Sequence, residues 1–234
     1  MKKIALFVEG QTEQIFISEL IHQLFTEHKT VIKTHQMRRL HHNISIETII
    51  TNEAKEYFIM IYDCGTDDKV KSDILDNYQK LQKADFNYII GLQDFFNPKR
   101  QKIKMTVQQF KKGLNSGLDQ AIFTELFLAV QEIEAWFIAE DEHYKNFFPN
   151  ISLEIINSIA GVNVRTEDTE KIPHPSIVLD KIYKKCGRTS GYSKNKYIVR
   201  DIVNSLDFTN LYIHVRKRNS SLNTLLICLD SIIP

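Results

Sequence analysis

The chain has 234 residues, of which 43% are hydrophobic and 25% are charged, and its formal charge is only +1. This composition is typical of a folded domain and argues against wholesale disorder. The near-zero charge excludes a general electrostatic attraction to nucleic acid, so any such affinity has to come from local clusters. Cys64, Cys186 and Cys228 have no CxxC spacing and predict neither a disulfide framework nor a zinc site. The chain shows no signal-peptide pattern and no apolar run long enough for a bilayer, which predicts a cytoplasmic protein without membrane partners.

Short apolar runs and segments of helical periodicity alternate over the first 130 residues. Strands are predicted at 4–8, 44–50, 57–62, 88–92 and 122–130, and a further short strand near Val31. Helices are predicted at 12–25, 70–83 and 105–114 from their apolar spacing. Continuous apolar strands followed by helices are typical of parallel sheets joined by right-handed crossovers. We therefore predict an α/β fold with a mostly parallel sheet flanked by helices.

The rest of the chain has helical character. Helical patterns occur at 132–140, 151–160, 175–185, 195–206 and 219–231, with polar segments between them. No repeat, low-complexity tract or clear linker separates this part from the rest. The predicted organisation is an α/β core at 1–148 and a helical C-terminal extension at 149–234 packed on it.

Acidic residues follow several of the predicted strands. These residues are Glu9, Asp63, Asp94 and the pair Glu132 and Glu134. In open parallel sheets, ligand sites form beyond the carboxyl ends of the strands. Hard cations such as Mg²⁺ prefer carboxylate oxygens, and a cation held there can activate water for phosphodiester cleavage. A single acid at a strand end is more often a helix cap or a solvated turn, so the prediction depends on several of them converging.

Glu9 is the most distinctive of these acids because it emerges directly from a buried strand and precedes Gly10. A capping role would suit Thr12 or Glu13 better, since they lie at the start of the following helix. Gly10 belongs to neither a Walker A nor a GxGxxG pattern, which disfavours a nucleotide-binding loop. Glu9 is thus left without an obvious structural role.

A basic segment follows Asp94 closely and contains Lys99, Arg100, Lys102 and Lys104. Basic loops are most often solvated surface, but this one would bring a phosphate backbone near the acidic site. We predict that these four side chains contact nucleic acid.

Three segments of the sequence resemble the Toprim domain, the metal-binding catalytic fold of topoisomerases, primases and nucleases related to overcoming-lysogenization-defect proteins. They are Phe7-Val8-Glu9-Gly10-Gln11-Thr12-Glu13, Gly91-Leu92-Gln93-Asp94 and Val130-Gln131-Glu132-Ile133-Glu134-Ala135-Trp136-Phe137, and Ser220-Ser221-Leu222 is a looser match. More narrowly, the chain resembles an uncharacterised bacterial Toprim-like family often encoded beside ABC-type ATPases in restriction and phage-defence loci.

The resemblance implies roles for particular residues. Glu9 would be the general acid/base or metal-linked glutamate, and Asp94 the first metal-binding aspartate. The usual Asp-x-Asp reads Asp94-Phe95-Phe96 here, so the second aspartate is missing. Glu132 and Glu134 are candidates to replace it, because alternate residues of an extended segment point the same way. If a helix already begins at residue 132, only one of them can face the site.

The expected function is Mg²⁺- or Mn²⁺-dependent cleavage of DNA or RNA, in the context of phage defence. Glu9, Asp94, Glu132 and Glu134 would be both catalytic and metal-binding residues. One alternative is a non-catalytic Toprim subunit that binds an ABC-type ATPase, which the missing aspartate and the near-zero charge favour. A third possibility is RNA processing or a primase-like activity at the same site.

Overall fold

The computed structural model describes residues 1–24, 30–36, 47–50, 56–66, 69–95, 106–109, 112 and 122–233. The chain divides into two compact units. The first comprises 1–93 and 97–128, and the second comprises 94–96 and 129–234. The predicted boundary at 148/149 therefore falls within the second unit. Most of the predicted helix 105–114 and the basic residues Lys99, Arg100, Lys102 and Lys104 lie outside the described residues.

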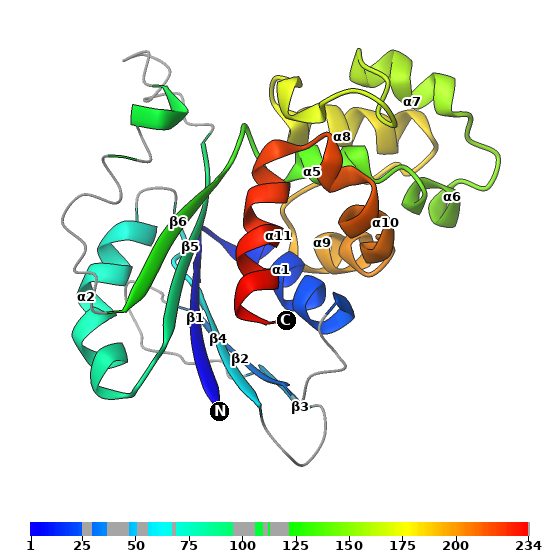
Figure 1. The fold of residues 1–234 in the computed structure, drawn as a ribbon. Coiled ribbons are helices and arrows are strands. Elements are labelled where there is room, and N and C mark those ends of the chain that lie inside the picture. The colour runs from blue at the N-terminus through cyan, green and yellow to red at the C-terminus, as the bar shows by residue number, and fades with distance from the viewer. Residues whose placement is uncertain are drawn as a thin grey trace. The chain divides into compact units, whose positions relative to one another are not determined.

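A six-stranded sheet in the order β3-β2-β4-β1-β5-β6 organises the first unit (Figure 1). The strands are β1 (Lys2–Val8), β2 (Thr30–Gln36), β3 (Glu47–Ile50), β4 (Tyr57–Asp63), β5 (Tyr88–Asp94) and β6 (Phe123–Ala129). β2, β4, β1 and β5 pair in parallel, whereas β3 runs antiparallel to β2 at one edge. The predicted α/β class with a mostly parallel sheet is confirmed.

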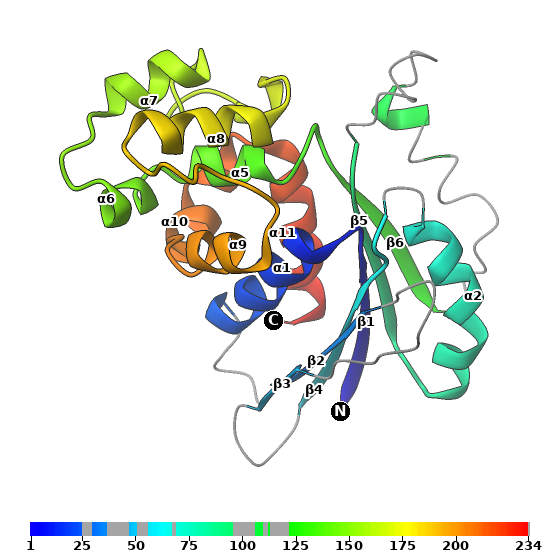
Figure 2. The ribbon, with the colours of Figure 1, turned by 180° about the vertical axis from the view of Figure 1, so that it is seen from behind.

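Two helices of the first unit, α1 (Gln11–Leu24) and α2 (Val70–Lys83), lie on opposite faces of this sheet (Figures 1 and 2). Right-handed crossovers produce this arrangement, because α1 leads from β1 toward β2 and α2 leads from β4 across β1 to β5. Phe7 packs with Val70 and Ile74 in a buried apolar cluster beneath α2. β1 and β5 are buried over most of their length, which explains why continuous apolar runs predicted these two strands within two residues.

Gly91 in β5 allows close packing at this face of the sheet. A Cβ at this position would lie 1.9 Å from Leu126 Cδ2 and 3.1 Å from Val70 Cγ1. Both neighbours are buried core side chains, so no larger residue fits without displacing them. Gly91 thus sets the packing of the strand that ends at Asp94.

The second unit is built from helices. They are α5 (Glu134–Ala139), α6 (His143–Phe147), α7 (Leu153–Ala160), α8 (Pro175–Lys185), α9 (Lys196–Val203), α10 (Phe208–Ile213) and α11 (Ser220–Ile232), with 3-10 turns η1 (Thr169–Lys171) and η2 (Val215–Lys217). The predicted helical character of the C-terminal part is confirmed. α6 and α10 were not predicted, because helices of five and six residues are too short to show a period. No helix within the described ranges is long and apolar enough to cross a membrane.

α5 is the buried centre of this unit, and each of its six residues is buried. The Trp136 indole N–H is shared between Glu170 Oε1 at 3.3 Å and Ser221 Oγ at 3.2 Å. Glu170 also accepts from the Ser221 backbone N–H at 2.9 Å, at the start of α11. Trp136 and Phe137 are fully buried. The sequence segments around Trp136 and Ser221 therefore have a structural role, in joining α5, η1 and α11.

Candidate metal centre

Asp94 closes β5 and is fixed by the segment that follows β6. Its Oδ1 accepts a hydrogen bond of 3.1 Å from the backbone N–H of Ile133. The next residue, Phe95, donates its N–H to the Ala129 carbonyl at 2.8 Å. The Asp94 side chain is 4% exposed. Both hydrogen bonds lie within the second unit, which includes residues 94–96.

Glu132 lies just before α5 and is bound at the start of α8. Its Oε2 accepts from the Ser176 backbone N–H at 2.8 Å, and its Oε1 accepts from the Ser176 hydroxyl at 3.1 Å. Pro175 is the first residue of α8, so these donors belong to the first turn, where the helix dipole favours a carboxylate. Gln131, with φ of 66°, redirects the chain before Glu132. Because α5 begins only at Glu134, both glutamates can reach the same place.

Asp94, Glu132 and Glu134 come together. Each offers a carboxylate oxygen, and these oxygens all lie within 4.8 Å of one another. The structure therefore brings together three of the four acids predicted to form the site. Glu9 lies in the first unit, directly after β1, and its participation in the same site stays a prediction. Asp63, the last residue of β4, accepts a hydrogen bond of 2.9 Å from the Gly65 N–H, which is a turn-forming role.

Glu134 is the least satisfied of the three carboxylates. It is fully buried, and its Oε1 accepts a short hydrogen bond of 2.6 Å from the Tyr192 hydroxyl. Its Oε2 has no hydrogen-bond partner within the described part of the chain. Burial raises the pKa of Glu134, the nearby Glu132 raises it further, and Lys194 and Tyr192 offset part of this increase.

Lys194 places an ammonium group beside all three carboxylates. Its Nζ lies 3.5 Å from Glu134 Oε1, 3.8 Å from Asp94 Oδ2 and 3.9 Å from Glu132 Oε1. The side chain is 49% exposed, so it reaches the cluster from solvent. A half-exposed cation on a flexible stem balances the negative charge without being locked in place.

The loop that carries Tyr192 and Lys194 is anchored on α8. The Tyr192 backbone N–H donates to Asp180 Oδ1 at 3.0 Å. Gly191 precedes it with φ of 58°, and a Cβ there would lie 2.0 Å from the same oxygen. Sequence reasoning missed Tyr192 and treated Lys194 only as part of a basic stretch. The one available signal was the glycine-bounded loop 187–191 just before them.

The cluster fits a hard divalent cation. Its donors are all carboxylate oxygens, the set that Mg²⁺ and Mn²⁺ prefer. The unpartnered Oε2 of buried Glu134 is a polar atom that a cation would satisfy, since buried polar atoms in native proteins nearly always have a partner. Asp94, Glu132 and Glu134 would hold such an ion.

The fold and the site define an α/β protein with a buried three-carboxylate cluster in its second unit. The chain belongs to the family described as "Domain of unknown function (DUF4276)", whose model matches residues 8–210. A comparison with curated proteins gave no match. Among solved structures, the chain is similar to one titled "The crystal structure of the putative cell surface hydrolase from Lactobacillus plantarum WCFS1". That likeness has 14% identity over 87% of this chain and 88% of the other, with a TM-score of 0.31.

Proposed function

We propose that the chain is a nuclease of the Toprim kind, which cleaves phosphodiester bonds with Mg²⁺ or Mn²⁺ held by Asp94, Glu132 and Glu134. The observation that supports this most is buried Glu134, with an unpartnered oxygen inside a three-carboxylate cluster. A desolvated carboxylate with a raised pKa, beside other acids, is characteristic of functional sites. The Toprim relationship, the nucleic-acid substrate and the role in phage defence rest on the resemblance of the sequence segments.

The side chains have separable roles in this proposal. A bound divalent cation supplies charge stabilisation at the phosphate oxygens and activates water. Ile133 N–H and Ser176 orient Asp94 and Glu132, so two carboxylates are held ready before a cation arrives. Glu134, whose pKa is raised, holds a proton at its unpartnered oxygen over a wider pH range than an ordinary glutamate and releases it when a cation binds.

Lys194 would compete with the cation for the same oxygens. Both are positive, and the ammonium already lies within 3.9 Å of each carboxylate. Because the side chain is half exposed, it can turn toward solvent and there meet the phosphate of a substrate. We assign general acid/base chemistry to Glu9 and phosphate contacts to Lys99, Arg100, Lys102 and Lys104, and these roles rest on the resemblance and the sequence alone.

The proposal is tested by two measurements on the full chain, cation binding and nucleic-acid cleavage. Calorimetry with Mn²⁺ should show binding that Asp94→Asn and Glu134→Gln each weaken by about tenfold or more. Incubation with labelled DNA, RNA or nucleotides should show metal-dependent cleavage. The substrate that is cleaved fastest distinguishes a nuclease from an RNA-processing or primase-like enzyme. Glu154→Gln is the matched control, since Glu154 is an exposed acid on α7. Cleavage that persists in both Asp94→Asn and Glu134→Gln would refute the proposal.

A second candidate is a non-catalytic subunit that binds an ABC-type ATPase, with the acidic cluster serving structure alone. The position of Lys194 supports it, because one ammonium beside three acids, one of them with a raised pKa, already balances part of the charge. Lys194→Gln distinguishes the two candidates. A metal centre predicts several-fold tighter Mn²⁺ binding after this change, since the competing cation is gone. A structural cluster predicts lower stability and no Mn²⁺ binding at millimolar concentration in either protein.

A further inference from the structure

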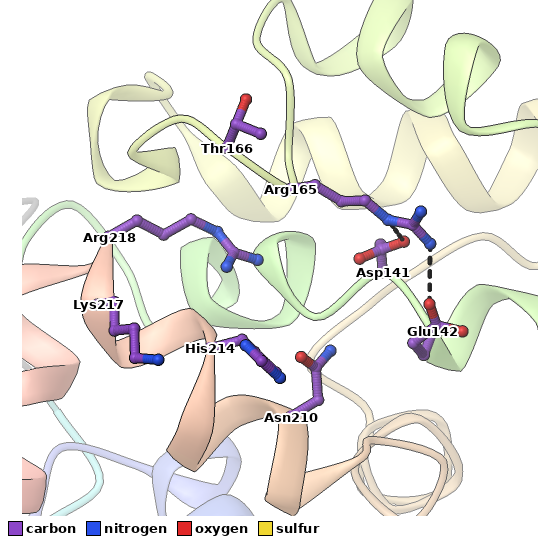
Figure 3. A pocket seen from close by; sticks show the side chains of 8 residues that line it. All are labelled: Asp141, Glu142, Arg165, Thr166, Asn210, His214, Lys217 and Arg218. Atoms are coloured by element: carbon purple, nitrogen blue, oxygen red, sulfur yellow. Dashed lines mark hydrogen bonds and ion pairs between the residues drawn. The ribbon is translucent and has the colours of Figure 1, made fainter.

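The second unit contains a pocket that shares no residue with the acidic cluster. Its volume is about 370 Å³, within the range of small-ligand sites. Figure 3 shows the Arg165 ion pairs along one side and basic side chains facing them from the other. The residues that matter here are Asp141, Glu142, Arg165, His214, Lys217 and Arg218.

The two acids of this pocket are already neutralised. Arg165 donates from Nε to Asp141 Oδ2 at 2.6 Å and from Nη2 to Glu142 Oε1 at 2.8 Å (Figure 3). Lys145 lies 2.5 Å from the other oxygen of Glu142. The hydrogen bond to Asp141 is the main cause that raises the pKa of Arg165. Neither carboxylate is therefore left to attract a cation.

On the opposite side of the pocket, Arg218 and Lys217 have no acid within ion-pair distance among the described residues, although the charges of Asp141 and Glu140 act on Arg218. Arg218 is held by two backbone carbonyls, from Nε to Val164 O at 3.1 Å and from Nη2 to Ala139 O at 2.7 Å. Among the described residues it forms no ion pair, and burial lowers the pKa of its guanidinium. Two carbonyls use two of its five N–H groups, so the rest of the fork remains available to a ligand.

Two further donors accompany Arg218. The 3-10 turn η2 brings His214 and Lys217 beside it, and both side chains are exposed. Within the described part of the chain, neither side chain has a hydrogen bond or an ion pair. In Figure 3 the Arg218, Lys217 and His214 side chains extend into the same space. A fixed guanidinium fork with a mobile ammonium and an imidazole is a donor set that matches phosphate oxygens.

We propose that this pocket binds a phosphate group, presented either by a mononucleotide or by the phosphorylated end of a nucleic-acid strand. Charge and shape carry this inference: two carboxylates are neutralised, whereas Lys217 and Arg218 have no acidic partner among the described residues. A phosphate would also satisfy the remaining N–H groups of partly buried Arg218. The site goes beyond the proposed cleavage function, because it needs neither the acidic cluster nor a metal ion.

The test measures binding to the full chain with a chelator present, which removes any contribution from the metal centre. Three probes are titrated by calorimetry: inorganic phosphate, adenosine monophosphate and a short single-stranded oligonucleotide with either a 5′-phosphate or a 5′-hydroxyl. Lys217→Gln should weaken binding about tenfold, as expected for loss of one charge-assisted contact. Tighter binding of the mononucleotide, or of the 5′-phosphorylated strand over the 5′-hydroxyl strand, identifies the source of the phosphate.

Lys181→Gln is the matched control, because Lys181 is an exposed lysine of α8 outside the pocket. His214→Gln is a second variant of the pocket and also changes an exposed side chain. Arg218 is left unchanged, because it also donates hydrogen bonds to two backbone carbonyls and its loss could destabilise the fold. Binding of any probe that falls with Lys217→Gln and persists with Lys181→Gln supports the site. Absence of binding to every probe at millimolar concentration, or equal losses in Lys217→Gln and Lys181→Gln, overturns it.

Discussion

The two ends of α5 carry two fully buried glutamates with opposite surroundings. Glu134 is the first residue of the helix, Glu140 follows its last residue, and both are 0% exposed. Among the described residues, Glu134 receives one hydrogen bond, from Tyr192, and its second oxygen has no partner. Glu140 accepts hydrogen bonds at both oxygens, from the backbone N–H groups of Glu142, His143 and Asp207 and from the Asn210 side chain.

The pKa values of these glutamates move in opposite directions. Burial raises the pKa of Glu134, and its neighbours do not reverse the effect. Burial also acts to raise the pKa of Glu140, but hydrogen bonding and charge from His143 and the donors from Asn210 and Asp207 lower it below the ordinary value. Both side chains are fully buried, so the difference comes from the surrounding hydrogen bonds and charges, which favour the ionised form more strongly at Glu140. Glu140 is a satisfied structural anion, whereas Glu134 has capacity left for a ligand.

The largest expected effect is on stability at Glu140. Glu140→Gln replaces an acceptor by an NH₂ group among several donors and removes the charge beside buried His143. The donors that bind the Glu140 carboxylate would be left poorly satisfied, at a cost of about 1–3 kcal/mol for each buried group. Urea unfolding of the variant and the parent measures the loss. A decrease below about 1 kcal/mol would show that Glu140 is not the anchor described here.

Glu134→Gln should behave differently in the same assay. The amide keeps an acceptor for the Tyr192 hydroxyl and removes the need to bury a charge. We expect a free energy of unfolding within about 1 kcal/mol of the parent at neutral pH, or higher. A loss as large as that of Glu140→Gln would mean that both glutamates are structural, and the contrast between them would fail.

The pH dependence of stability should have opposite signs at the two ends of α5. Glu140, with its lowered pKa, stabilises the fold above the unfolded value of about 4.3, and this stabilisation is lost as the pH falls through its folded pKa. Glu134, with its raised pKa, binds its proton more tightly in the folded chain, so stability decreases as the pH rises from about 4.3 through the folded pKa.

Urea midpoints between about pH 3 and about pH 8 test this prediction. The stability lost in Glu140→Gln relative to the parent should become smaller as the pH is lowered. The stability of Glu134→Gln relative to the parent should increase as the pH rises toward neutral. Parallel profiles for the two variants would contradict the opposite pKa directions.

The smallest effect is expected at Ser176, whose hydroxyl donates to Glu132. Ser176→Ala removes this hydrogen bond but leaves the backbone N–H that binds the same carboxylate. Stability should fall by about 1 kcal/mol, with a modest loss of Mn²⁺ affinity because Glu132 is less firmly oriented. Ser152→Ala, at the start of α7, is a control for loss of a serine hydroxyl near a helix N-terminus. If Ser152→Ala weakens Mn²⁺ binding equally, Ser176 has no specific part in orienting Glu132.

Much of the sheet could be predicted because its central strands are buried on both faces and leave continuous apolar runs. The end of α2 was predicted at Lys83, where the observed helix also ends. Asp94, Glu132 and Glu134 could be placed near one another because parallel strands end at a common edge. Tyr192 and Lys194 could not be placed near this cluster from the sequence. Their positions depend on the turn at Gly191, which packs against Asp180 of α8, and hydrophobic periodicity does not predict such a contact. The full set of hydrogen bonds to Glu140 could not be predicted either, because two of its donors come from α10 and the residue before it, far along the chain.

The wide spacing of the site residues along the chain has a consequence for biosynthesis. The strands of the sheet all precede residue 130, whereas the contact between Glu134 and Tyr192 spans 58 residues. At about 5–20 residues per second, the helical unit emerges from the ribosome several seconds after the last strand. A chain halted before Tyr192 would hold Asp94, Glu132 and Glu134 with neither the hydroxyl nor the ammonium that accompany them. The acidic cluster therefore acquires its full surroundings only after residue 194 has been synthesised.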